Sequence, residues 1–367
     1  MKKCAVISLY GNVNFGNKLQ NYAVSQLLKK NNIESEIIRY SHYENDKNYH
    51  RNFLKIFDSK FLLNKIKNIY EIKINKKSIS ERNNNFNLFN KFMNYSDFII
   101  NNKEEVKKLN EMYDYFLFGS DQIWNVGAFR FYDLAFGTYF DRNKKFSLSA
   151  SFGRENIPNE YKEKYKKALN EFKMISVRED AGKKIVKDIA EREDALVLLD
   201  PTMMLDCDDW DKVAKKPVNY NGEKYILNYF LGNLSKEKKE AIELLAKQKG
   251  YKIINILDIN DPFYCSGPSE FLYLEKNAEL ICTDSFHSAV FGILYKTPFI
   301  VFERNDSNAS MNSRLETLLN KFKFEDRYYK GVLDEKYLTC DYSHCKKILE
   351  EERKKTDEFL KKVLEIE

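Results

Sequence analysis

Histidine 287 lies in the stretch of this chain best suited to proton transfer. The segment "ELICTDSFHSAVFGILY" has an apolar run from Leu280 to Thr283, typical of a buried strand, and then Asp284 and Ser285, either of which can cap a following helix. His287 falls in the first turn of that helix, where exposed N–H groups and partial positive charge favour anions and a neutral imidazole. Such a histidine can act as a general acid or base. The alternative is a structural histidine bonded to Asp284 or to the backbone.

Two arginines also follow predicted strands. Arg178 ends the strand in "FKMISVREDAGKKIV", directly before a helix, where its paired N–H donors could clamp a phosphate or a carboxylate. The alternative for Arg178 is a surface ion pair with Glu179 or Asp180. Arg314 begins a helix after the strand "FIVFE" and could reach the same place.

A Gly/Asn loop at 11–18 connects an apolar run to a helical pattern in "SLYGNVNFGNKLQNYAVSQLLKK". A second strand follows, and this β-loop-α-β order predicts a parallel sheet with ligands at the carboxyl ends of its strands. Asn17 and Lys18 at the end of the loop are therefore candidate ligand-binding residues, as are Asp121 and Gln122 after the strand "YFLFG", which suit a hydroxyl-rich ligand. The alternative is a connection that binds nothing, since no dinucleotide or Walker glycine spacing is present.

The elements needed to position these residues form two α/β series. We predict an α/β fold with two Rossmann-like domains that face a cleft. The first covers 1–205 with a helical insertion at about 43–110, the second covers 206–340 and holds the donor site, and 341–367 forms a C-terminal helix. Phe86, Phe89 and Phe92 at helical spacing indicate core.

Composition excludes several classes of protein. The 367 residues carry 61 Lys+Arg against 55 Asp+Glu, a net charge of only +6 that is spread along the chain, so we expect no nucleic-acid partner. No signal peptide or transmembrane run is visible, and we expect a cytoplasmic protein whose Lys-rich helices allow peripheral membrane association. Cys340, His344 and Cys345 lie close together but lack a fourth ligand and zinc-like spacing, so no metal is expected.

Several short motifs together resemble the polysaccharide pyruvyl transferase family. They occur in order over nearly the whole chain: "GNVNFGNKLQNYA" (11–23), "GSDQIWN" (119–125), "ASFG" (150–153), "SVRE" (176–179), "DPTMML" (200–205), "GPSEFL" (267–272), "CTDSFHSAVFGIL" (282–294) and "SRLETLL" (313–319). The resemblance implies a GT-B-type fold and transfer of pyruvate from phosphoenolpyruvate to two hydroxyls of a sugar, which forms a cyclic ketal on a cell-surface glycan or its lipid-linked precursor. No cofactor is implied beyond phosphoenolpyruvate as the donor substrate.

The resemblance also implies roles for individual residues. His287 matches the catalytic histidine of the family, and Arg178 matches an arginine that binds the donor. Some members have an arginine two positions before the histidine, where this chain has Ser285, so Lys18 or Arg314 would have to supply that charge. The 11–18 loop, Asp121 and Gln122 are expected to face the acceptor.

Two other functions remain open from the sequence. A glycosyltransferase that uses a nucleotide sugar would suit the same fold, because fold does not fix function. A non-catalytic protein of a glycan-assembly complex is the other, with Ser285 as a sign of lost donor binding. The choice of donor separates these alternatives from pyruvyl transfer.

Overall fold

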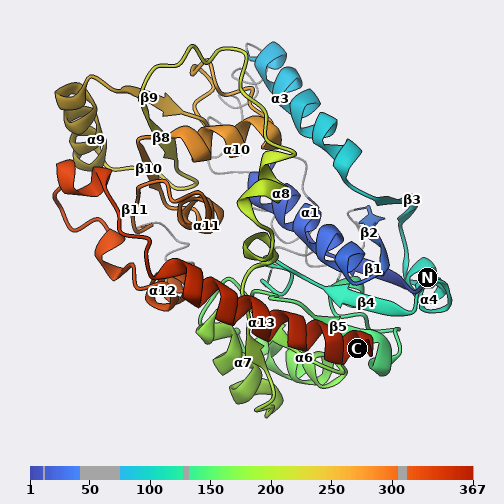
Figure 1. Ribbon diagram of the computed structural model, residues 1–367. Helices are drawn as coiled ribbons and strands as arrows, with labels where there is room; N and C mark the ends of the chain where they lie inside the picture. Colours follow the sequence, from blue (N-terminus) through green and yellow to red (C-terminus); the bar gives the residue numbers. More distant parts are fainter. Residues whose placement is uncertain (11–12, 42–74, 127–131, 305–311, 367) are drawn as a thin grey trace, which may run out of the picture.

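The computed structural model describes residues 1–10, 13–41, 75–126, 132–304 and 312–366. Figure 1 shows two α/β units side by side, with the long helix α13 (Cys345–Leu364) running across both. Each unit contains a parallel sheet, as the alternating pattern of strands and helices predicts.

The first unit is built on a five-stranded parallel sheet in the order β3-β2-β1-β4-β5. Its strands are β1 (Lys3–Ile7), β2 (Glu34–Tyr40), β3 (Tyr95–Ile100), β4 (Tyr115–Phe118) and β5 (Lys145–Ser147). Parallel bridges from Phe146 to Met174 and from Ala150 to Val177 continue it into the pair β6 (Ser176–Val177) and β7 (Leu196–Val197). The helices of this unit are α1 (Phe15–Lys30), α3 (Lys76–Leu88), α4 (Lys103–Met112), α5 (Tyr132–Ala135), α6 (Asn159–Asn170) and α7 (Asp180–Ala190), with 3-10 turns η2 (Phe89–Phe92) and η3 (Arg142–Lys144).

The second unit has a four-stranded parallel sheet in the order β11-β10-β8-β9. Its strands are β8 (Tyr225–Tyr229), β9 (Lys252–Asn255), β10 (Leu280–Thr283) and β11 (Phe299–Val301). Around them lie α8 (Cys207–Asp211), α9 (Lys236–Lys249), α10 (Pro268–Asn277), α11 (Phe286–Tyr295) and α12 (Asn312–Lys321), with 3-10 turns η4 (Pro201–Met204), η6 (Glu325–Arg327) and η7 (Glu335–Leu338). Gly250 ends α9 in the left-handed conformation (φ 68°), the helix end expected from the sequence.

One hydrophobic core joins the two units. Phe15, at the start of α1, stacks on Phe271 of α10 with ring centroids 4.3 Å apart and also meets Phe86 of α3 at 4.9 Å. Arg82 of α3 donates to the backbone oxygens of Ile256 and Tyr264 in the second unit. The amino end of α1 is therefore held against the second unit, which fixes the position of the loop before it.

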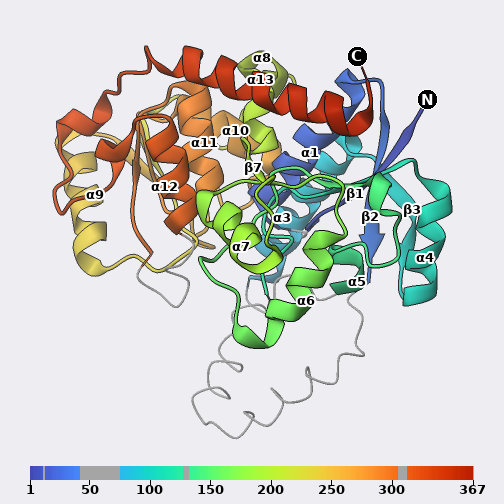
Figure 2. The same cartoon turned by 90° about the horizontal axis from the view of Figure 1, so that it is seen from below.

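Helix α13 returns the chain to the first unit. Its last two turns bring Phe359, Leu360, Val363 and Leu364 into the core under β1 and β4, and the Tyr115 hydroxyl donates to the backbone oxygen of Leu364 at 2.6 Å. Figure 2 shows α13 along one side of the molecule, reaching from the second unit to the C-terminus beside β1. The predicted C-terminal helix is confirmed.

The described part of the predicted helical insertion at about 43–110 contains a strand as well as helices. Residues 75–92 form α3 and η2, as a helical insertion would, and Phe86 and Phe89 are buried core residues. Residues 95–100, however, form β3, the edge strand of the first sheet, because this segment pairs with β2. The part at 42–74 lies outside the described residues. The predicted boundary near 205 falls between η4 and α8, and the division into domains stays a prediction.

Candidate functional site

His287 is held at the junction of the two units. It is the second residue of α11, which follows β10 of the second sheet, and it is 7 % exposed. Its imidazole lies directly on the first turn of α1 of the other unit: a Cβ built on Gly16 would stand 2.1 Å from Nδ1 and 2.8 Å from Cγ. Only a glycine at position 16 therefore permits this close approach of backbone and imidazole.

Asp200 is the carboxylate that faces His287. Its Oδ2 lies 3.7 Å from Nε2 of His287 and accepts hydrogen bonds from Ser120 Oγ and Arg178 Nη1, both at 2.9 Å. The N–H and hydroxyl of Thr202 hold Oδ1. Burial alone would raise the pKa of Asp200, but the approach and charge of His287, the charge of Arg178 and the Thr202 N–H together hold that pKa well below its ordinary value. Asp200 is thus an ionised group whose negative charge faces the imidazole.

Arg178 connects Asp200 to a second carboxylate. Its Nη2 donates to Asp121 Oδ1 at 3.0 Å, and its guanidinium lies 4.4 Å from the ring centroid of Phe286, the residue before His287. The Arg178 side chain is 1 % exposed, so the surface ion pair considered from the sequence is absent, and Glu179 Oε2 is no nearer than 4.0 Å to Nε. Burial disfavours the charge of Arg178, but Asp121 and Asp200 outweigh it and raise its pKa.

Asp121 and Arg314 complete the polar cluster. Asp121 follows β4 in the left-handed conformation (φ 60°), an uncommon conformation for a non-glycine residue that is concentrated at functional sites. Its Oδ2 accepts from Asn17 Nδ2, and its Oδ1 lies 3.9 Å from Arg314 Nη1. With the amide oxygen of Gln122 facing Arg314, that oxygen accepts from Nη1 and Nη2 at 3.1 and 3.2 Å. Burial, and then the charge of Arg178, lower the pKa of Arg314 to about 10.

Four buried polar atoms in this cluster have no hydrogen-bond partner among the described residues. They are His287 Nε2, Arg178 Nε, Arg314 Nε and Glu179 Oε2. None of these four residues is more than 7 % exposed. Buried polar groups are nearly always hydrogen-bonded, since leaving one unpaired costs about 1–3 kcal/mol. The arrangement therefore suits a polar ligand that supplies the missing partners.

The family of the chain follows from a match over most of its length. A family model described as "Polysaccharide pyruvyl transferase" matches residues 14–307, which include α1, the Asp121–Arg178–Asp200 cluster and the start of α11. The chain belongs to the polysaccharide pyruvyl transferase family. A search of curated proteins found no match.

Solved structures show that this pyruvyl transferase family member has a GT-B-type fold, as predicted. A Listeria monocytogenes protein provisionally assigned as a UDP-N-acetylglucosamine 2-epimerase is 11 % identical, with 97 % of this chain and 91 % of that chain covered and a TM-score of 0.52. The Neisseria meningitidis UDP-GlcNAc 2-epimerase bound to UDP-GlcNAc gives 12 % identity, 96 % and 99 % coverage and a TM-score of 0.46. MurG from Acinetobacter baumannii is 9 % identical, with 100 % of each chain covered and a TM-score of 0.43. At these identities the likeness concerns the fold alone.

The structure brings together most of the residues that the sequence singled out in this pyruvyl transferase family member. His287, Arg178, Asp121, Gln122 and Arg314 are linked by the contacts above, and Asn17 joins them through Asp121. Their roles in binding or catalysis stay predictions. Gly11 and Asn12 of the loop lie outside the described residues.

The hydrogen bonds of the Lys18 and Ser285 side chains differ from those expected from the sequence. The Lys18 ammonium donates to Asn90 Oδ1 at 2.7 Å and to the Tyr95 hydroxyl at 2.9 Å, so it is directed to η2 and β3 instead of to the His287 cluster. It does not supply the missing charge there. Ser285 occupies the N-cap position of α11, but its side chain makes no capping hydrogen bond. Asp284, the other candidate cap and the partner of His287 in the alternative of a structural histidine, instead accepts from the N–H groups of Leu231 and Gly232 and from Arg304.

Sequence reasoning missed Asp200, Ser120 and Gly16 as site residues. Asp200 lies three residues after β7, which bridges join through β6 to the end of the first sheet, so its position in the sequence is compatible with the edge that holds Asp121. No signal in the sequence points to the contact of Gly16 with a histidine 271 positions later. The described residues include no group of three or more His, Cys, Asp or Glu placed to hold a metal. No described helix combines the length and apolar character that a membrane span needs.

Proposed function

We propose that this protein transfers pyruvate from phosphoenolpyruvate to two hydroxyls of a sugar in a cell-surface glycan or its lipid-linked precursor, as a cyclic ketal. The observation that carries the proposal is the approach of His287 to Asp200 at the junction of the two units, beside two buried arginines whose Nε atoms have no hydrogen-bond partner among the described residues. Membership of the polysaccharide pyruvyl transferase family supports it.

The chemistry needs groups of the kinds present in the cluster. One sugar hydroxyl adds to C2 of phosphoenolpyruvate while C3 gains a proton and becomes a methyl group. The second hydroxyl then displaces phosphate from C2 and closes the ring. Each hydroxyl loses a proton, so a group that both accepts and delivers protons is required next to the donor.

We assign the proton transfers to Nε2 of His287. Nε2 has no hydrogen-bond partner among the described residues, which leaves it available to a reacting group. The carboxylate of Asp200, held by Arg178 and Ser120, lies 3.7 Å from Nε2 and would attract positive charge that develops on the imidazole during the transfer. The Nε–H groups of Arg178 and Arg314 would bind the carboxylate or the phosphate of the donor. Asp121 and Gln122 would hold the acceptor hydroxyls.

Ligand-dependent thermal unfolding tests the choice of donor without a known acceptor. The protein is titrated with phosphoenolpyruvate, UDP, GDP, CMP and inorganic phosphate, since a ligand at a hundred times its Kd stabilises the folded state by about 2.7 kcal/mol. We expect phosphoenolpyruvate to raise Tm selectively, and Arg314→Gln to reduce that rise. Lys236→Gln, on an exposed position of α9, is the matched control and should leave it unchanged.

The results separate the candidate functions. Stabilisation by one nucleotide and not by phosphoenolpyruvate would refute the proposal in favour of glycosyl transfer. If phosphoenolpyruvate binds, a screen of sugar acceptors for phosphate release follows, and His287→Gln should abolish that release. A His287→Gln protein that releases phosphate at the full rate would exclude the proton-transfer role.

A further inference from the structure

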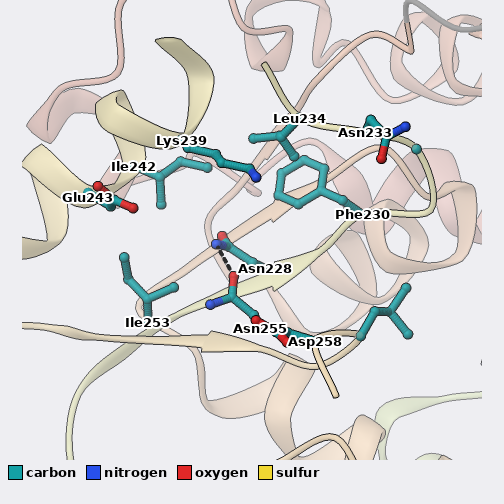
Figure 3. A pocket seen from close by; sticks show the side chains of 12 residues that line it. Asn228, Phe230, Asn233, Leu234, Lys239, Ile242, Glu243, Ile253, Asn255 and Asp258 are labelled. Atoms are coloured by element: carbon teal, nitrogen blue, oxygen red, sulfur yellow. Dashed lines mark hydrogen bonds between the residues drawn. The ribbon is translucent and has the colours of Figure 1, made fainter. Parts of the chain in front are cut away.

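A cavity of about 530 Å³ opens beside the carboxyl ends of β8 and β9, away from the contacts of the His287 cluster. Its walls come from β8, β9, the loop after β8 and the first turns of α9. Figure 3 shows the side chain of Lys239 extending into it from α9, with the paired amides of Asn228 and Asn255 across from it. None of these residues has a part in the proposed reaction.

The polar groups of the cavity are amides arranged to bind neutral donors and acceptors. Asn228 Nδ2 donates to Asn255 Oδ1 at 2.9 Å, which uses one donor and one acceptor of the pair. The amide nitrogen of Asn255 is a further donor of the pair, and Asn228 Oδ1 is buried with no hydrogen-bond partner in the described part of the chain. A third amide, Asn233, lies in the loop after β8, and the half-buried ring of Phe230 provides an apolar face.

Charge argues against an anionic ligand in this cavity. Its lining residues include one cation, Lys239, and two acids, Glu243 and Asp258. Two N–H groups of the loop after β8 are already used, since Leu231 N and Gly232 N donate to Asp284 at 2.7 and 2.8 Å. The remaining combination of amides, carboxylates, one amine and an aromatic face suits the hydroxyls and C–H face of a sugar.

The wall of the cavity is linked to the helix that carries His287. Gly232 lines the cavity, and its N–H is held by Asp284, three residues before His287. Arg304 donates to the same carboxylate at 3.0 Å, so Asp284 fixes the loop after β8 and the chain after β11 to the start of α11. A sugar in the cavity would thus contact a loop that is tied to the catalytic helix.

We propose that this cavity is a second carbohydrate subsite, which binds an uncharged sugar residue of the acceptor glycan other than the one that is pyruvylated. The inference rests on the proposed function in that the acceptor is a glycan. It gives the protein a means of selecting acceptors by a sugar remote from the new ketal.

Saturation-transfer NMR on the full chain tests the subsite with N-acetylglucosamine, N-acetylmannosamine, glucose and galactose as separate probes, and UMP as the nucleotide probe. We expect at least one sugar to bind and its Kd to rise about tenfold in Asn255→Leu, which removes the amide but keeps the volume. Lys239→Met should weaken the binding of the same sugar. Lys236→Met, the same change on the exposed face of α9, should not, and the Tm of each variant verifies folding.

The outcomes distinguish this inference from the proposed function. Three results would overturn the proposed subsite. They are the absence of any sugar signal, a sugar signal that is unchanged in both Asn255→Leu and Lys239→Met, and binding of UMP alone. Loss of the sugar signal in Asp121→Asn but not in Asn255→Leu would also overturn it, while leaving pyruvyl transfer intact. A sugar signal that depends on Asn255, in a protein that phosphoenolpyruvate fails to stabilise, would keep the subsite and refute pyruvyl transfer.

Discussion

Replacing Gly16 by alanine tests the contact between α1 and His287. The added Cβ would stand 2.1 Å from Nδ1, about 1.3 Å short of the 3.4 Å at which ordinary contact begins. Because Cγ is also only 2.8 Å away, the ring cannot escape by a small rotation of its far end, and the whole imidazole must move. A misplacement of about 1 Å can cost roughly a hundredfold in rate. We therefore expect kcat for phosphate release from phosphoenolpyruvate to fall about a hundredfold in Gly16→Ala.

Stability should respond differently from activity. Alanine is a better helix former than glycine by about 0.5–1 kcal/mol, which offsets part of the strain, so the urea midpoint should change little. Gly182→Ala, in α7 of the same unit, is the matched control because its Cβ would meet Val177 at 3.2 Å and no imidazole. It should retain near-normal kcat.

A double-mutant cycle decides whether the effect passes through the imidazole. In a His287→Ala background the ring is gone, so Gly16→Ala should have no further effect on the residual rate. Full activity of Gly16→Ala would refute the reasoning. An equal fall in both backgrounds would show that Gly16 acts by another route.

Three further predictions concern charge and packing. Arg178→Ala leaves Asp121 and Asp200 without their shared cation, so the free energy of unfolding measured with urea should fall by roughly 3–5 kcal/mol; a loss under 1 kcal/mol would contradict the buried pairing. Burial raises the pKa of Glu275 well above its ordinary 4.5, so the folded state keeps a proton that the unfolded chain releases, and stability is lost as pH rises from about 4.5 through the folded-state pKa. Glu275→Gln should flatten that decline in urea titrations, and identical pH profiles would count against a protonated Glu275. Leu360→Ala should cost about 2–5 kcal/mol, because the side chain is fully buried beneath β1 and β4, and an unchanged urea midpoint would show that α13 does not seal that core.

The sequence predicted the site where strand order alone brings residues together. Asp121 follows β4 of the first sheet, and Arg178 follows β6, which parallel bridges join to the end of that sheet, so both residues lie at a common carboxyl edge. His287 could be placed at the start of its helix because a polar pair separates it from an apolar strand. The two α/β units were predicted from the same alternation of strands and helices, and the GT-B-type fold from the resemblance to the family.

Other features depend on contacts that no local pattern encodes. Lys18 is the fourth residue of α1, and the turn of the helix directs it to Asn90 and Tyr95 instead of to the cluster. The approach of Gly16 to His287 arises only when the two units pack through Phe15. Strand β3 was missed because its short apolar segment lies in a region rich in Lys and Asn, where pairing with β2 decides the conformation.

The return of α13 to the first sheet has a consequence for how the protein is synthesised. Val6 of β1 packs in one core with Val24 and Leu28 of α1 and with Leu360 and Val363 of α13, so this face of the first sheet is only partly covered until α13 has left the ribosome. At roughly 5–20 residues per second the intervening chain takes on the order of 20 to 70 s to translate. Nascent chains arrested before residue 345 should therefore remain protease-sensitive in β1, and early protection there would disprove this order. During that interval the apolar face is available to a chaperone, and the strand made first is among the last to be completed.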